Sequence, residues 1–155
     1  MEIKDRVAII TGGGGGIGSA TARKWISEGA RQVVVADYNE ETALQVAEEL
    51  GCVGVGLDVT NEEAVIQLVE DTENANGPVD IFFSNAGAGA EGGVEAPNDA
   101  WQSQWELHVM SHVYAARAVL PSMTARGEGY LVHTARAAGL LAAVGSAPYS
   151  VTKAA

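Results

Sequence analysis

Five consecutive glycines, Gly12–Gly16, constrain this 155-residue chain more than any other feature, because they separate an apolar run from a helical pattern. The run Val7–Thr11 has the continuous apolar character of a strand that is buried on both faces. After Gly18, apolar residues recur at helical spacing to about Glu28, which predicts a helix directly after the glycines. Glycine tolerates positive φ and close backbone approach, so Thr11–Gly18 predicts a tight strand-to-helix turn. The N-terminus of that helix would stabilise the charge of a phosphate group.

The rest of the chain repeats this order of strand and helix, which is typical of parallel sheets connected by helices. The predicted strands are Val7–Thr11, Gln32–Asp37, Val53–Leu57, Ile81–Asn85 and Tyr130–Ala135. The predicted helices run from the glycine turn to about Glu28, from Asn39 as N-cap to Leu50, from Asn61 as N-cap to Gly77-Pro78, from about Asn98 to Arg126 with a bend at Pro121, and from Ala147-Pro148 onward. We therefore expect an α/β fold with a doubly wound parallel sheet, helices on both faces, and truncation after the fifth strand.

An acidic residue closes the second predicted strand. Asp37 lies 19 residues after Gly18, close to the ~20 at which dinucleotide-binding folds place a carboxylate on the ribose hydroxyls. Together these features favour a Rossmann-type dinucleotide site in which Gly12, Gly16, Ile17 and Gly18 form the phosphate turn. Asp37 would repel the 2′-phosphate of NADP, so NAD is the preferred cofactor and NADP the less favoured one. No Lys-Ser/Thr pair follows the glycines, which argues against a nucleoside triphosphate site; an S-adenosylmethionine site stays open at this point.

Composition limits the kinds of partner. The chain has 9 basic and 20 acidic residues, a formal net charge of −11 and a sequence pI of about 4.5. Nucleic acids and anionic membranes attract basic patches, so neither is an expected partner. We also expect no metal site. No apolar run approaches the ~20 residues that span a bilayer, and the lone Cys52 suits a reducing compartment. We expect residues 1–155 to form a single dinucleotide-binding domain in the cytoplasm.

Four motifs occur in the order and approximate spacing of the short-chain dehydrogenase/reductase family. They are Thr11-Gly12-x-x-x-Gly16-Ile17-Gly18, Asp58-Val59, Asn85-Ala86-Gly87 and Tyr149-x-x-x-Lys153. A Tyr and a Lys four residues apart arise by chance in many chains, whereas four motifs on the expected elements are a specific signal. Over its whole length the chain resembles the N-terminal, cofactor-binding portion of this family.

The resemblance implies an NAD-dependent oxidoreductase that acts on a small alcohol or carbonyl substrate. It implies that Asp58 binds the adenine with Val59 alongside, and that Asn85-Ala86-Gly87 lines the cofactor cleft. Tyr149 would be the general acid/base while hydride moves to or from the nicotinamide. Lys153, one helical turn further on, would activate the phenol and hold the nicotinamide ribose.

Two catalytic positions depart from the family pattern. The family usually has a serine thirteen residues before the tyrosine, and here Arg136 stands there. Arginine also donates hydrogen bonds and could stabilise an alkoxide or a phenolate, but it is larger and would fill substrate space. The family's helix asparagine, which holds a water, is replaced by His108; a histidine could hold that water or disrupt the relay. Thr134 is too early in its predicted strand to replace the serine.

The sequence is therefore compatible with two functions from different classes. The first is an oxidoreductase whose catalytic set is Tyr149, Lys153, Arg136 and His108. The second is a catalytically impaired NAD-binding or scaffolding protein that keeps the glycine turn and Asp37. Members of the family continue through further elements, so we expect the domain to be incomplete at its C-terminus, with the fifth strand as an exposed edge. A full-length version is expected to form a homo-oligomer.

Overall fold

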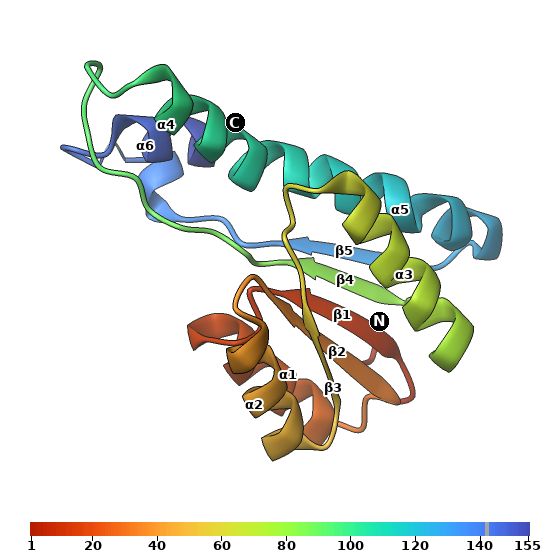
Figure 1. Ribbon diagram of the computed structural model, residues 1–155. Helices are drawn as coiled ribbons and strands as arrows, with labels where there is room; N and C mark the ends of the chain where they lie inside the picture. Colours follow the sequence, from red (N-terminus) through yellow and green to blue (C-terminus); the bar gives the residue numbers. More distant parts are fainter. Residues whose placement is uncertain (142) are drawn as a thin grey trace.

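The computed structural model describes residues 1–141 and 143–155, and the side chain of Ala138 lies outside that description. Within these residues, five parallel strands form one sheet: β1 (Val7–Thr11), β2 (Gln32–Asp37), β3 (Val53–Gly56), β4 (Ile81–Ser84) and β5 (Tyr130–His133). Their order is β3-β2-β1-β4-β5, so the chain builds outward from β1 to β3 and then returns to add β4 and β5 on the other side (Figure 1). The predicted Rossmann-type doubly wound sheet is confirmed.

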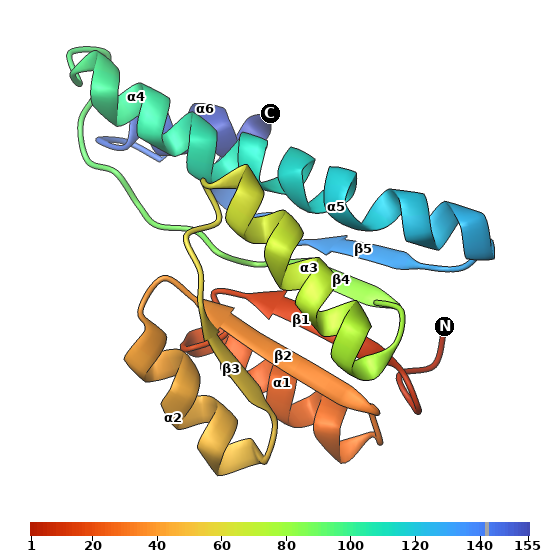
Figure 2. The same ribbon diagram turned by 45° about the vertical axis from the view of Figure 1, so that its right-hand side comes forward.

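Helices cover both faces of the sheet. The helices α1 (Gly16–Ser27) and α2 (Glu40–Leu50) lie on one face, and α3 (Glu62–Asn76) and α5 (Ser111–Arg126) lie side by side on the other (Figures 1 and 2). Two further helices, α4 (Asn98–Trp105) and α6 (Ala147–Ala154), pack against each other beyond the carboxyl ends of the strands. A π-helical turn, Glu106–Met110, joins α4 to α5, and a 3₁₀ turn, Ala137–Gly139, follows β5.

The pleat of β1 divides the core into two halves. Successive side chains of a strand point to opposite faces, so Ile9 packs toward α3 and α5 while Ile10 packs toward α1 and α2. Both isoleucines have 0% exposure, and burying such a side chain contributes about 1.5–3 kcal/mol. Burial on both faces explains why the strand sequences are apolar without alternation.

Side chains at the helix ends explain several boundaries that the sequence predicts. Asn39 Oδ1 accepts a hydrogen bond from Thr42 N at 3.3 Å, and Asn61 Oδ1 accepts one from Ala64 N at 3.2 Å. These bonds satisfy backbone donors that the first helical turn leaves free. The predicted helix starts after Asn39 and Asn61 are confirmed.

Some boundaries differ from the prediction. The helix α1 begins at Gly16 rather than after Gly18, and three strands stop one or two residues early, at Gly56, Ser84 and His133. The early stop of β4 has a direct cause, because Asn85 N donates to the Thr11 hydroxyl at 3.1 Å instead of continuing the sheet.

The long predicted helix is irregular at a different place from the one expected. Its bounds, Asn98 and Arg126, are confirmed, and α5 continues through Pro121. The regular α-helical pattern is interrupted at Glu106–Met110, where the backbone forms the wider π turn.

The strand β5 lies at one edge of the sheet, as predicted, with Tyr130 and His133 exposed. None of the helices in the described ranges is sufficiently long and apolar to cross a membrane.

Candidate active site

The glycine turn is built by contacts that only glycine allows. Gly12 has φ +62° and Gly16 has φ +41°, backbone conformations that other residues rarely adopt. A Cβ on Gly18 would lie 2.2 Å from the carbonyl oxygen of Gly12, so α1 packs directly onto the turn. A Cβ on Gly15 or Gly16 would meet nothing within 4 Å. The turn is therefore compact on its inner side and open on the side that faces the cleft.

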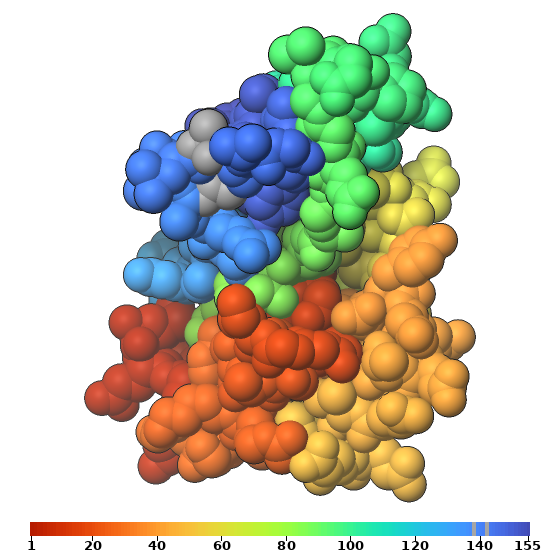
Figure 3. Space-filling view, turned by 90° about the vertical axis from the view of Figure 1, so that its left-hand side faces the viewer, coloured from red at the N-terminus to blue at the C-terminus, as the bar shows by residue number. Residues whose placement is uncertain are grey.

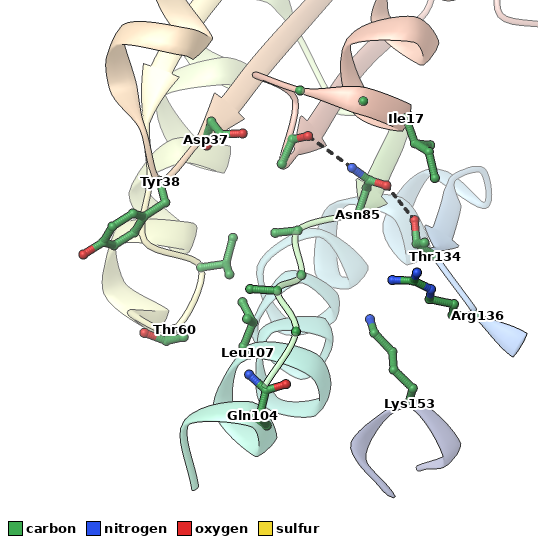
Figure 4. Close-up of a pocket in the computed structure, with 18 of the residues that line it drawn as sticks. Ile17, Asp37, Tyr38, Thr60, Asn85, Gln104, Leu107, Thr134, Arg136 and Lys153 are labelled. Carbon is green, nitrogen blue, oxygen red and sulfur yellow. Dashed lines mark hydrogen bonds between the residues drawn. The ribbon is translucent and has the colours of Figure 1, made fainter. Parts of the chain in front are cut away.

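Asp37 holds the turn against the end of β2. Its Oδ2 accepts a hydrogen bond from Gly14 N at 2.9 Å, and its Oδ1 accepts one from Asn39 N at 3.0 Å. A carboxylate has about four acceptor positions, so these two bonds leave capacity for a ligand. The side chain lines the cleft, where Figure 4 shows it beside Tyr38.

Asn85 joins the ends of three strands. Its Nδ2 donates to the carbonyl oxygens of Thr11 and Gly12, both at 3.2 Å, and its Oδ1 accepts from Thr134 Oγ1 at 2.8 Å (Figure 4). The Thr11 hydroxyl in turn accepts from the backbone N–H groups of Asn85 and Ala86. This network fixes the glycine turn relative to β4 and to the residue that follows β5.

The second end of the cleft is formed by α6 and the segment after β5. Tyr149 is 8% exposed, and its hydroxyl accepts a hydrogen bond from Arg136 Nη1 at 3.0 Å. Lys153 Nζ lies 6.0 Å from the centre of the Tyr149 ring. Burial lowers the pKa of Lys153, and the positive charge of Arg136 lowers it further. One cation therefore contacts the phenol hydroxyl, and a second lies near the ring.

His108 lies behind these residues, in the π-helical turn. It is 3% exposed; its Nδ1 is 2.9 Å from Thr152 Oγ1, and its ring meets the Tyr149 ring edge-on with the centroids 5.1 Å apart. Its Nε2 is buried and has no hydrogen-bond partner among the described residues. Burial, followed by the nearby charges of Lys153 and His112, lowers the pKa of His108 to about 4, so the ring is neutral at pH 7. His108 thus contributes shape and a hydrogen bond at neutral pH, not a charge.

The two ends face one cleft of about 970 Å³ at the carboxyl edge of the sheet, where open α/β sheets bind ligands. Figure 3 views this edge, with the red and orange glycine-turn region below the green segment after β4 and the blue C-terminal segments. The predicted residues that line the cleft are Gly12, Gly16, Ile17, Asp37, Asp58, Val59, Asn85, Ala86, Gly87, Arg136, Tyr149 and Lys153. Gly18 and His108 lie just behind its wall.

Three further lining residues lie in segments that the sequence placed near a ligand: Gly15 in the glycine turn, and Ala88 and Gly89 in the small-residue loop 86–93. The lining residues without such a prediction are Tyr38, Leu57, Thr60, Ser103, Gln104, Leu107, Thr134 and Ala135. Tyr38 directly follows Asp37 and Thr60 directly follows Val59, so adjacency to a predicted site residue could have indicated them. Gln104 in α4 and Leu107 in the π turn belong to no sequence motif, so nothing in the sequence indicated them. The predicted end of the fifth strand at Ala135 is wrong, because β5 ends at His133 and Thr134 already belongs to the cleft wall. That Thr134 does not replace the serine stays a prediction; its hydroxyl donates to Asn85 Oδ1.

Asp58 also has a local role. Its Oδ1 accepts hydrogen bonds from Thr60 N at 2.9 Å and from Thr60 Oγ1 at 2.7 Å, which shapes the loop after β3. Across residues 1–141 and 143–155, no group of three or more His, Cys, Asp or Glu side chains is arranged to hold a metal ion.

The sheet order, the glycine turn and the acid at the end of β2 define a dinucleotide-binding Rossmann fold with a Tyr/Lys pair at its open edge. The chain belongs to the short-chain dehydrogenase family, whose sequence pattern matches residues 6–155. It is 35% identical over 157 residues to an uncharacterised oxidoreductase of Staphylococcus aureus (strain USA300), covering 99% of this chain and 68% of that protein.

Two crystal structures are similar over nearly the whole chain. A short-chain dehydrogenase/reductase from Burkholderia phymatum in complex with NAD has a TM-score of 0.92 and 33% sequence identity. NAD⁺-bound xylitol dehydrogenase has a TM-score of 0.90 and 31% identity. Each comparison covers 99% of this chain, but the chain spans only 57% and 62% of the two structures, respectively.

Proposed function

We propose that this chain binds NAD in the cleft and that the whole protein uses it to transfer hydride between the nicotinamide and an alcohol or carbonyl compound. The observation that carries this proposal is the shared cleft, which the glycine turn and Asp37 line at one end and Tyr149 and Lys153 line at the other. The open space over Gly15 and Gly16 fits a pyrophosphate that the α1 N-terminus would stabilise.

NAD is favoured over NADP in this proposal because of the charge at the ribose end. Asp37 retains acceptor capacity for ribose hydroxyls and would repel a 2′-phosphate. The residues from Gly12 to Gly18 include no basic side chain that could attract one. Asp58 and Val59 would line the adenine subsite, with Tyr38 and Thr60 beside them.

At the reacting end, Tyr149 would exchange a proton with the substrate oxygen. The hydroxyl oxygen already accepts from Arg136 Nη1, so its own hydrogen is free to point toward a substrate. Bound NAD would supply the hydride acceptor or donor. Arg136 would replace the family's serine as the donor to a substrate oxygen, since its fixed charge can stabilise a developing alkoxide. Lys153, half-buried beside this pair, would hold the ribose nearest the reacting centre.

A second candidate function is an NAD-binding protein with little or no turnover. Arg136 favours it, because its guanidinium already occupies the hydrogen-bonding position at the Tyr149 hydroxyl. The arrangement around His108 also favours it, because Nδ1 is bonded to Thr152 and Nε2 has no partner in the described structure. The two candidates share the NAD site and differ only in the reacting end.

Two measurements separate these functions. Calorimetric titration of the 155-residue chain should give NAD binding at least tenfold tighter than NADP, and Asp37→Ala should remove most of that difference. Absence of NAD binding would refute both candidates. Hydride transfer is then followed at the nicotinamide absorbance with the whole protein and a panel of alcohols and ketones. Turnover by the unaltered protein supports the enzyme; turnover only after combined Arg136→Ser and His108→Asn substitution supports the impaired one.

We also propose that a full-length version assembles as a homo-oligomer. The edge strand β5, with Tyr130 exposed, leaves a sheet edge that the rest of a full-length chain, a second copy, or both would cover. Light scattering of the whole protein tests this, and a monomer at micromolar concentration would contradict it.

A further inference from the structure

Two cations face the cleft without a carboxylate partner. The chain has 9 basic residues against 20 acidic ones, and five of the basic side chains form ion pairs with carboxylates: Arg6, Arg23, Lys24, Arg117 and Arg126. Arg136 and Lys153 have no carboxylate oxygen within 4.0 Å among the described residues, although both line the cleft. A strongly acidic chain thus keeps two unneutralised positive charges at one end of its binding site.

The geometry directs these charges toward a common space. Figure 4 shows Arg136 reaching in from the segment after β5 and Lys153 reaching up from α6, while Asp37 lies at the opposite end of the cleft. Arg136 uses Nη1 on the Tyr149 hydroxyl at 3.0 Å, and a guanidinium has five N–H donors, so most of its donors stay available.

The two charges also oppose each other. Burial lowers the pKa of Lys153, and the repulsion from Arg136 lowers it further. A bound anion would relieve this repulsion and would satisfy the free guanidinium donors. Arginine is the side chain best suited to this, since its planar fork matches a carboxylate with two parallel hydrogen bonds.

We propose that the substrate reacting at Tyr149 is a carboxylate, a 2-hydroxy or 2-oxo acid, and that Arg136 binds its carboxylate group. This inference rests on the proposed oxidoreductase function and specifies its substrate class. Because Arg136 already touches the Tyr149 hydroxyl, a carboxylate on the same guanidinium places the oxygen of the adjacent carbon next to that hydroxyl. In the oxidation direction the C2 hydrogen would leave as hydride to NAD⁺, while the substrate hydroxyl proton would pass to Tyr149 in its phenolate form and from there to solvent. The 2-hydroxy acid and NAD⁺ thereby give the 2-oxo acid, NADH and one proton.

The proposal also accounts for the arginine where the family has serine. A serine hydroxyl donates one hydrogen bond to a neutral carbonyl oxygen, whereas an arginine there can bind a carboxylate and donate to the acid/base at the same time. The size of Arg136, which obstructs a neutral substrate, becomes part of the binding site for an acid.

Binding, rather than turnover, tests this directly. The 155-residue chain is titrated calorimetrically, with and without saturating NAD, with pyruvate and phenylpyruvate and with their uncharged primary amides. We expect at least one acid to bind tenfold or more tightly than its amide. Arg136→Gln should abolish that preference, and Arg136→Lys should retain part of it. Arg117→Gln, which removes one charge at an exposed pair with Glu62, is the matched control and should leave the preference unchanged.

Equal binding of acid and amide, no binding of either acid, or a preference that survives Arg136→Gln would each overturn the proposal. Circular dichroism of each variant ensures that a lost preference reflects the site and not the fold. Failure of NAD to bind while the Arg136-dependent acid preference persists would refute the proposed function and leave the anion site standing. NAD binding without any acid preference would refute the anion site alone.

Discussion

Substituting Gly18 by alanine should destabilise the fold through one backbone contact. A Cβ at this position would lie 2.2 Å from the Gly12 carbonyl oxygen and 2.8 Å from Gly13 Cα. Both neighbours are backbone, so no side-chain rotation relieves the overlap, and overpacking of this kind costs about 3 kcal/mol. Gly18 is helical, and alanine in a helix recovers up to about 1 kcal/mol. We therefore expect Gly18→Ala to lower the free energy of unfolding by about 2 kcal/mol.

Gly15 provides the matched control for this substitution. Its φ of −145° suits any residue, and a Cβ there meets nothing within 4 Å. The poorer N-capping by alanine and the lower entropy of its unfolded state offset each other, so Gly15→Ala should change stability by less than about 0.5 kcal/mol. Because Gly15 lines the cleft, the same variant should weaken NAD binding.

Urea denaturation followed by circular dichroism measures both effects. Gly18→Ala should shift the midpoint to lower urea with an unchanged slope, while Gly15→Ala should leave the midpoint in place. If Gly18→Ala is as stable as the unaltered chain, the close packing of α1 on the turn is not a constraint, and the reasoning from this contact is wrong.

Two further predictions concern buried polar groups. The Asp80 side chain is 4% exposed; it accepts a hydrogen bond from Val7 N and pairs with Arg6 and Arg126. Asp80→Ala should therefore lower the free energy of unfolding by about 3–5 kcal/mol, measured by urea denaturation. A loss under about 1 kcal/mol would contradict this prediction. The pKa of His108 in the folded chain is about 4, below its ordinary 6.5, so the unfolded chain binds more protons between these values. The contribution of His108 to stability should therefore be complete above pH 6.5 and be lost as the pH drops toward 4. Burial also lowers the pKa of His112 to about 4, so His108→Asn should reduce the slope of stability against pH without removing it; an unchanged slope would refute the assignment.

The sequence is sufficient to predict the fold because the core imposes a simple pattern. Strands buried on both faces must be apolar throughout, and the caps at Asn39 and Asn61 mark where the helices begin. The strand ends were predicted less well. At the carboxyl edge of the sheet, backbone N–H groups donate to side chains such as Thr11 instead of to a neighbouring strand. No local sequence pattern predicts where the strand hydrogen bonds are replaced in this way.

The same boundary effect limits what could be predicted for the site. Motif residues such as Asp37 and Tyr149 lie in the cleft, because their spacing follows the repeat of strand and helix. The end of β5 was predicted two residues too late, so Thr134 was assigned to the strand rather than to the cleft wall. No residue type in Glu106–Met110 predicts the π turn that forms there. Pro121, the residue that does predict a helix break, lies inside the continuous helix α5.

Arg136 and His108 appear in the sequence as two independent departures from the family, but in the structure both act on Tyr149. Arg136 donates to the hydroxyl, and His108 packs edge-on against the ring and bonds to Thr152 on the same helix. Residues that share a partner do not contribute additively, so reverting either one alone leaves Tyr149 positioned by the other. Arg136→Ser alone removes the donor and leaves a bulky neutral ring behind the tyrosine. Restored turnover is therefore expected only when both substitutions are combined.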